Sequence, residues 1–247
     1  MITIKSHREI ELMRMAGKIV SDTFKEIANY LKPGITTNEI NEIADRYIRS
    51  QGAIPSFLNY EGYPKSVCIS VNDEVVHGIP GSRKLCEGDI VSLDMGTIYK
   101  GYQGDSAKTY AVGQISPEAQ RLIDVTRQCF YEGIKFAKPG YRLHDISYAI
   151  QKYAEDHGYS VVRELTGHGI GTEMHEDPSI PNYGKPGTGV RLQKGMTLAI
   201  EPMIVIGRRN VCVLDDDWTV VTEDGSLAAH YEHTIAITDG EPQILTL

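Results

Sequence analysis

The sequence predicts an α/β protein (α+β) with two similar halves, each containing a pair of helices followed by antiparallel strands. Helical patterns followed by short β-branched runs occur twice, and identical helical residues recur 106 positions apart, as from Phe24 to Phe130. The chain has 247 residues, 41% hydrophobic and 23% charged, which suffices for a buried core and excludes a disordered or fibrous protein. We expect a single domain over residues 1–247 with pseudo-two-fold halves at about 6–112 and 116–240.

Two helices are predicted at the start of the first half. The first begins at the Ser-x-x-Glu capping box of residues 6–9, and its apolar residues recur at steps of three and four as far as Leu31. The Lys-Pro-Gly sequence at 32–34 stops this pattern. The second helix begins at the Thr-x-x-Glu box of residues 36–39 and ends at Gln-Gly 51–52.

The predicted strands of the first half are short β-branched runs between Gly and Asp turns. They cover residues 66–71, 90–95 and 109–112.

The second half repeats this order. A helix is predicted from Ser116, followed by proline at the first helical position, to about residue 137, before a second Lys-Pro-Gly at 138–140. A second helix follows from the repeat, and strands are expected at 160–163, 197–205, 219–222 and 234–238. The segment 178–195 is rich in Pro and Gly and is expected to be a surface excursion beside a cleft between the halves.

Charge and cysteine content exclude several classes of protein. The 25 Lys and Arg against 33 Asp and Glu give a net charge of −8, and no basic run could follow a phosphate backbone, so DNA is not an expected partner. The four cysteines form no C-x-x-C pair and are expected to be reduced thiols in a cytoplasmic protein. No signal peptide and no run of about 18 apolar residues is present, so no membrane partner is expected.

Two aspartates of the first half suggest a cation site. If the chain reverses at residues 99–101, Asp94 and Asp105 lie close to opposite each other on paired strands, with Cβ atoms roughly 5 Å apart. Their like charges repel unless a cation lies between them, and divalent metals favour carboxylate oxygens. Either aspartate taken alone is more often a solvated turn residue.

Three residues of the second half extend this pattern. His168 stands between glycines, where the backbone can approach a ligand closely. Glu201 and Glu232 stand in or beside apolar strand-like runs, where a carboxylate is costly unless it is paired, metal-bound or protonated. Four carboxylates and one imidazole carry too much negative charge for one zinc ion and suit two divalent ions.

These blocks resemble the bacterial type I methionine aminopeptidases of the pita-bread metallopeptidase family. The resemblance extends from residue 9 to about 237, and the blocks around Asp94 and Asp105, at 167–171, at 201–202 and at 231–233 occur in the family's order. It implies a pita-bread fold. It also implies that the metal ligands are Asp94, Asp105, His168, Glu201 and Glu232.

The resemblance also implies a substrate site. The family's two further active-site histidines match His77 and His175. By position, the lining of the pocket for the methionine side chain matches Tyr60, Tyr63, Cys68 and Trp218. Met174 stands where many members have Phe, which can change the shape of the pocket wall while keeping a polarizable contact for a thioether.

The implied activity is removal of the initiator methionine from nascent proteins whose second residue is small. Two divalent ions, with Mn, Fe, Co and Zn left open, would share a bridging water whose lowered pKa makes hydroxide available to attack the first peptide bond. Glu201 would be the general base, His175 would stabilise the oxyanion, and His77 would contact the scissile amide nitrogen. The expected partners are nascent polypeptide N-termini, with contact at the ribosome left open, and the expected state is a monomer.

Two other classes remain open. Relatives that resemble prolidase and aminopeptidase P cut bonds to proline and usually carry an added N-terminal domain, for which 247 residues are expected to leave no room. Metal-free relatives serve as binding or chaperone modules and lose metal ligands, whereas all five positions are intact here. No N-terminal extension of the eukaryotic kind is expected.

Overall fold

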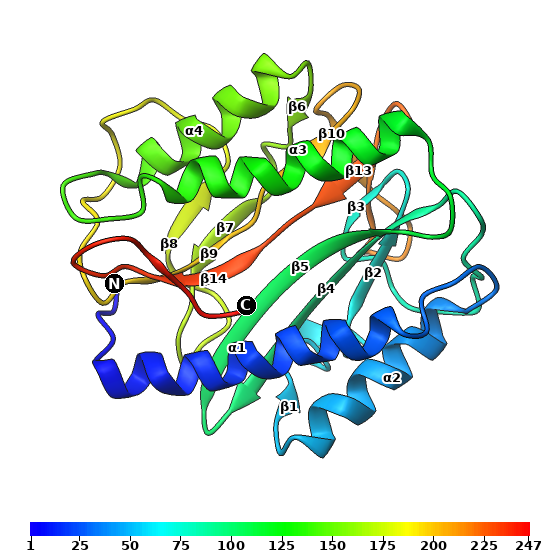
Figure 1. Ribbon diagram of the computed structural model, residues 1–247, viewed down its shortest axis with the longest axis horizontal. Coiled ribbons are helices and arrows are strands. Elements are labelled where there is room, and N and C mark those ends of the chain that lie inside the picture. Colours follow the sequence, from blue (N-terminus) through cyan, green and yellow to red (C-terminus); the bar gives the residue numbers. More distant parts are fainter.

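A computed structural model describes residues 1–247 (Figure 1). The helix pair α1 and α2 lies along one side of the molecule, the pair α3 and α4 lies along the opposite side, and the strands run between them (Figure 1). The elements up to residue 111 are α1 His7–Ala28, α2 Thr37–Ser50, β1 Ile54–Pro55, the short 3-10 helix Tyr60–Gly62, β2 Cys68–Val71, β3 Glu74–Val76, β4 Ile90–Tyr99 and β5 Tyr102–Ala111. The later elements are α3 Pro117–Ile134, α4 Leu143–Asp156, β6 Ser160–Val161, β7 Thr166–Gly169, β8 Glu176–Pro181, β9 Thr197–Ile200, β10 Met203–Val205, β11 Val211–Val213, β12 Val220–Thr222, β13 Ala228–His230, β14 His233–Ala236 and β15 Gln243–Ile244.

The helix starts predicted from the capping boxes are confirmed. The Glu9 carboxylate accepts a hydrogen bond from the Ser6 amide at 2.7 Å, and Thr36 and Glu39 form the same reciprocal pair before α2. The helix ends are less well predicted, because α1 ends at Ala28 and not near Leu31. The amide of Asn29 bonds back to the carbonyl of Glu26, and the chain turns there although the apolar pattern continues.

One strand prediction and one loop prediction of the second half were wrong in detail. The run 197–205 is not one strand, because it breaks into β9 and β10 at Glu201 and Pro202, where proline has no N–H for a ladder. The first residues of the excursion predicted at 178–195 belong instead to strand β8, Glu176–Pro181. In this strand Pro178 and Ile180 are buried and their neighbours are not. Because β8 is an edge strand of the sheet β15-β14-β9-β7-β8, it tolerates its prolines.

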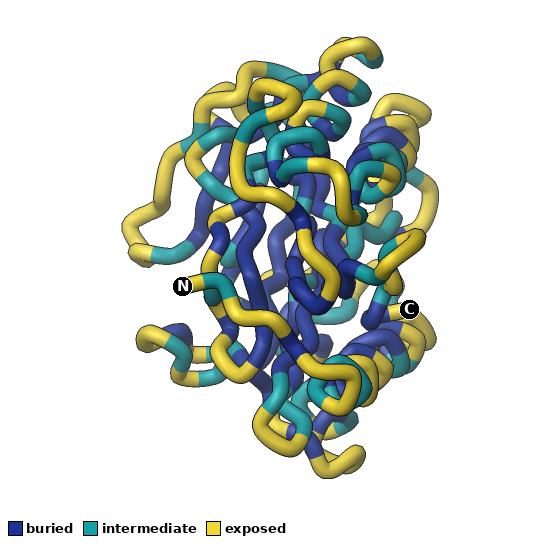
Figure 2. Tube along the Cα trace, turned by 90° about the vertical axis from the view of Figure 1, so that its left-hand side faces the viewer, coloured by how far each residue is buried: buried dark blue, intermediate teal, exposed yellow.

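The two helix pairs cover separate cores. A cluster of 22 buried residues lies under α3 and α4, and a cluster of 14 lies under α1 and α2. Figure 2 shows the buried chain concentrated in the strands between the helices. None of the helices combines the length and the apolar character that crossing a membrane would require.

The halves meet where β5 lies beside β14 (Figure 1). The amide of Glu232 donates to the Ala107 carbonyl at 2.8 Å, and the Ala107 amide donates back at 3.3 Å. The amide of Asp105 donates to the Thr234 hydroxyl at 3.1 Å. Two residues singled out for metal binding, Asp105 and Glu232, therefore lie on either side of this seam.

Candidate active site

A cavity of about 130 Å³ lies at the seam, and every residue that the sequence analysis assigned to the site lines it. Its charged wall consists of Asp94, Asp105, His168, Glu201 and Glu232. Its apolar wall consists of Phe57, Tyr60, Tyr63, Cys68, Met174 and Trp218. His77, His175 and Glu61 complete the lining.

The two aspartates of the charged wall lie on the β4–β5 hairpin, but not directly opposite each other. The register pairs Asp94 with Ala107 and Asp105 with Gly96, so the expected opposition is corrected to a diagonal one. The hairpin closes with Tyr99 paired to Tyr102, which sets the whole register. Because the offset is two residues, both side chains still point to the same face.

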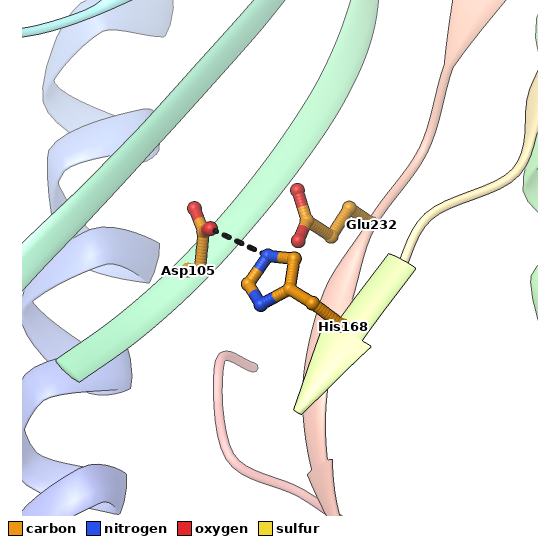
Figure 3. A group of neighbouring side chains, drawn as sticks. All are labelled: Asp105, His168 and Glu232. Carbon is orange, nitrogen blue, oxygen red and sulfur yellow. Dashed lines mark ion pairs between the residues drawn. The ribbon is translucent and has the colours of Figure 1, made fainter. Parts of the chain in front are cut away.

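The second half brings three more ligand-type groups to these aspartates. Asp105, His168 and Glu232 offer atoms that all lie within 4.8 Å of one another, and Figure 3 shows their side chains converging from three separate segments of the chain. The Nε2 atom of His168 lies 3.7 Å from Asp105 Oδ2 and 3.6 Å from Glu201 Oε1. Glu201 reaches this point from the break between β9 and β10.

The imidazole of His168 is oriented by its own backbone neighbour. Its Nδ1 lies 2.8 Å from the carbonyl oxygen of Gly169, which can only accept a hydrogen bond. A ring proton therefore lies on Nδ1, and Nε2 faces the carboxylates. This is the usual tautomer of a histidine ligand held by a second hydrogen bond.

The carboxylates of the charged wall are under electrostatic strain. Burial raises the pKa of Asp94 well above its ordinary value, and the nearby Asp105 raises it further. Burial raises the pKa of Glu201 and Glu232 in the same way, with the neighbouring carboxylates adding to the effect. Protons or cations must offset this repulsion.

Several oxygen atoms of the charged wall have no protein partner. Asp94 Oδ1, Asp105 Oδ1 and Glu232 Oε1 are buried and make no hydrogen bond. Such atoms are costly unless something binds them. Converging carboxylate oxygens and one imidazole nitrogen fit divalent cations, so the residues present suit a metal centre.

The apolar wall is packed, and its two tyrosine hydroxyls are hydrogen-bonded. The Tyr63 hydroxyl donates to the carbonyl of Gly78 at 2.8 Å, and its ring meets the ring of Trp218 edge-on at 5.1 Å between centroids. Met174 is 2% exposed and packs closely on Gly96, where a Cβ would lie 2.7 Å from the Met174 methyl. This wall offers aromatic and sulfur contacts to an apolar side chain.

His77 and His175 lie between the two walls. Burial lowers the pKa of both rings. His175 lowers the pKa of His77 further, and His168 lowers that of His175, so both rings are neutral near pH 7. His175 Nδ1 lies 2.8 Å from the Tyr60 hydroxyl, and its ring lies 4.4 Å from the ring of His168. His77 has a φ of 62°, an uncommon conformation for a residue with a side chain.

The sequence analysis missed three residues of this region, namely Phe57, Glu61 and His230. His230 is 2% exposed, and its Nε2 lies 3.9 Å from both Glu201 Oε2 and Glu232 Oε2. Burial, then His77, lowers its pKa to about 3, so the ring is neutral. The sequence held a signal for His230, because it stands two residues before Glu232 in a run with strand character. In an extended strand, residues two positions apart point to the same face.

The chain is similar to a known family of metallopeptidases. The model of metallopeptidase family M24 matches residues 11–239. A methionine aminopeptidase of Clostridium acetobutylicum is 56% identical over 248 residues, covering 100% of this chain and 99% of that protein. The crystal structure of methionine aminopeptidase from Rickettsia prowazekii has a TM-score of 0.99 at 46% identity and covers 100% of both chains.

More distant structures share the fold. Prolidase from Pyrococcus furiosus has a TM-score of 0.80 at 22% identity, with 99% of this chain and 65% of that chain covered. At this identity, the likeness concerns the fold alone.

Proposed function

The chain belongs to metallopeptidase family M24, and from that premise we propose that it is a methionine aminopeptidase that removes the initiator methionine from nascent proteins whose second residue is small. The pita-bread fold and peptidase class expected from the sequence are confirmed by these relatives. One observation carries the proposal: a charged wall of ligand-type groups and an apolar wall of aromatic and sulfur side chains line one small cavity. Such a cavity can hold one apolar side chain while its peptide bond meets the charged groups.

We propose that two divalent cations, drawn from Mn, Fe, Co or Zn, bind Asp94, Asp105, His168, Glu201 and Glu232. The unpartnered buried oxygens and raised carboxyl pKa values support this assignment. When bound, such ions lower the pKa of a water molecule and make a nucleophile available near neutral pH.

Glu201 is the proposed general base. It lies where proline interrupts the strand ladder, so its carboxylate projects into the cavity and is not fixed by ladder bonds on both sides. Burial, then Asp94 and Asp105, raises its pKa, which brings the carboxylate closer to the basicity that suits proton transfer. It accepts a proton from the attacking water and donates it to the leaving amine.

His175 is the proposed oxyanion donor, and His77 the contact for the scissile amide nitrogen. When the Tyr60 hydroxyl donates to Nδ1 of His175, the proton of the neutral ring lies on Nε2. This N–H then donates to the carbonyl oxygen as its negative charge develops. The methionine side chain of the substrate is held by the apolar wall, through Tyr60, Tyr63, Cys68, Met174 and Trp218.

We further infer that the whole chain forms one catalytic domain, with halves at about 6–112 and 116–240, and acts as a monomer. Its four cysteines are free, which suits a reducing cytoplasmic compartment. Nascent polypeptide N-termini are made in that compartment, and the ribosome is the place where the enzyme would meet them.

An activity screen tests the proposal. The purified protein is assayed on Met-Ala-Ser, Ala-Pro and Leu-Gly peptides with each of the four metals, and its metal content is measured. Hydrolysis of Met-Ala-Ser alone is expected. Preferred cleavage of Ala-Pro would indicate a prolidase-like enzyme, and protein without a stoichiometric divalent ion or peptidase activity would indicate a binding module.

A further inference from the structure

The N-terminal segment 1–5 contacts residues 171–177, which comprise the loop 171–175 with Met174 and His175 and the first two residues of β8. Lys5 Nζ lies 2.5 Å from Glu176 Oε2, although 171 positions separate the two residues. The Thr3 hydroxyl donates to the same oxygen at 2.5 Å, and the Met1 ammonium group pairs with Asp177. The first five residues of the chain therefore contact Glu176 and Asp177, which directly follow His175.

The Lys5–Glu176 pair is unusual for its burial. The side chains are 6% and 10% exposed, whereas Ile4 beside Lys5 is 52% exposed. Lysine and glutamate are rarely buried unless paired, and a buried pair is costly to form. Burial opposes ionisation of Glu176, but the hydrogen bonds from Lys5 and Thr3 prevail and lower its pKa.

The pair packs directly on the backbone of the loop. A Cβ at Gly171 would lie 2.3 Å from Glu176 Oε1 and 2.5 Å from Lys5 Cε, so a larger residue there would have to displace the pair. The Glu176 carboxylate also accepts a hydrogen bond from the Glu173 amide at 3.4 Å. From the other side, the Gln103 amide of β5 donates to the Gly171 carbonyl at 2.8 Å. The loop is therefore held between β5 and the N-terminal segment.

Met174 and His175 depend on this arrangement to different degrees. Met174 is anchored in a hydrophobic cluster with Met13, Ile170 and Ala199. The His175 side chain makes one hydrogen bond, to the Tyr60 hydroxyl, and its ring contacts the ring of His168. Otherwise the position of the His175 side chain depends on its own backbone, which lies next to Glu176. Loss of the ion pair should displace His175 more than Met174.

We propose that Lys5 and Glu176 are positioning residues that hold His175 against the substrate carbonyl. The inference rests on the proposed function, because the role of His175 belongs to it. Since His175 acts on charge that develops in the transition state, its displacement lowers kcat, while the independently anchored apolar wall keeps KM nearly constant. A displacement of about 1 Å can reduce the rate about 100-fold.

The first test replaces Lys5 by Met, which keeps the length and apolar stem of the side chain. We expect kcat on Met-Ala-Ser to fall about 10- to 100-fold, with KM within about threefold and the metal content unchanged. The matched control is Lys194→Met, which breaks the exposed Lys194–Asp239 pair. Lys194 lies beside Gly195, whose carbonyl accepts a hydrogen bond from the Lys5 amide at 2.8 Å. The Lys194→Met variant should leave kcat unchanged. An unchanged kcat in Lys5→Met overturns the proposal.

A double-mutant cycle separates positioning from general destabilisation. If Lys5 acts through His175, adding Lys5→Met to His175→Ala should lower kcat by less than about twofold more. The same factor in both backgrounds would show that Lys5 acts elsewhere, and would overturn the proposal.

If Lys5→Met folds poorly, a double variant that combines Lys5→Met with Glu176→Gln removes the uncompensated charge of Glu176. Its kcat should stay low while its thermal midpoint recovers, and recovery of both would overturn the proposal.

Hydrogen exchange provides a readout independent of activity. In Lys5→Met, amides at 173–177 should exchange faster, while those of β4 keep their rates. Unchanged exchange in the loop overturns the proposal. A wild-type protein inactive on Met-Ala-Ser would instead refute the proposed function, and the exchange experiment would still test the tether.

Discussion

The side chains of the charged wall come from strands and strand ends, whereas those of the apolar wall come mainly from loops. Asp94 and Asp105 are placed by the register of one hairpin, and His168 by a strand of the other half. Trp218, by contrast, lies in a turn where the Asp216 carboxylate accepts its amide hydrogen bond at 2.9 Å. The charged groups must meet across the seam between the halves, and strands are the more rigid support for that purpose.

The two walls also differ in how well their polar atoms are satisfied. The hydroxyl of Tyr63 in the apolar wall is hydrogen-bonded, whereas oxygens of Asp94, Asp105 and Glu232 in the charged wall have no protein partner. The apolar wall follows ordinary rules of packing. The charged wall departs from them, and such departures mark functional sites because folding alone does not favour them.

The largest expected effect comes from Glu201→Gln in the charged wall. Loss of the proposed base should lower kcat by about 100- to 10,000-fold, since amide nitrogen cannot accept the proton. The matched control is Glu74→Gln, because Glu74 is a largely buried carboxylate outside the cavity whose partners are the Val71 amide and Arg83. Steady-state kinetics on Met-Ala-Ser decide the matter, and a Glu201 variant with most of its activity would refute the base role.

Asp105→Asn and Glu232→Gln should weaken metal binding while the fold survives. Changes in the surroundings of metal ligands commonly cost about 10- to 100-fold in affinity, and loss of a ligand should cost at least as much. The fold should persist, because the backbone hydrogen bonds of Asp105 and Glu232 join β5 to the β14 region across the seam. The charges of the two side chains are not needed for these bonds. Calorimetric titration with Mn²⁺ and circular dichroism measure the two properties. Normal binding of two ions by either variant would contradict the assignment.

Trp218→Ala tests the apolar wall with a smaller effect. Removal of the ring deletes its edge-on contact with Tyr63 and one face of the pocket, so kcat/KM for Met-Ala-Ser should fall about 10-fold. Metal content should stay at the wild-type level, unlike in the charged-wall variants. A loss of metal together with activity would show that the two walls are not independent.

The smallest expected effect is a pH-dependent change in the stability of the metal-free protein. Burial, then the neighbouring carboxylates, raises the pKa of Glu232 above the value of 4.5 for the free side chain. Such a group stabilises the folded state fully below about pH 4.5 and loses that contribution as the pH rises through the folded-state pKa.

Glu232→Gln has no titrating group at this position, so it should raise the melting temperature of metal-free protein more at pH 8 than at pH 5. The gain in unfolding free energy should be larger at pH 8 than at pH 5, because burial and the neighbouring carboxylates disfavour the ionised form of Glu232. Differential scanning calorimetry in chelator measures it. An equal shift at both pH values would show that Glu232 is not strained by its neighbours.

Local patterns in the sequence determined the helices and the hairpin. The capping boxes at 6–9 and 36–39 and the apolar spacing after them act within one or two turns of chain, so they can be interpreted without knowing what packs nearby. The candidate site residues also came from the sequence, because the motifs around His168, Glu201 and Glu232 resemble those of a known family.

Only the tertiary structure decided how these residues meet. It set the diagonal placement of Asp94 and Asp105, brought His230 to within 3.9 Å of two carboxylates, and paired Lys5 with Glu176 across 171 positions. Such contacts depend on strand register and on packing between the two halves. These involve residues far apart in the chain, and no local pattern encodes which distant groups will lie together.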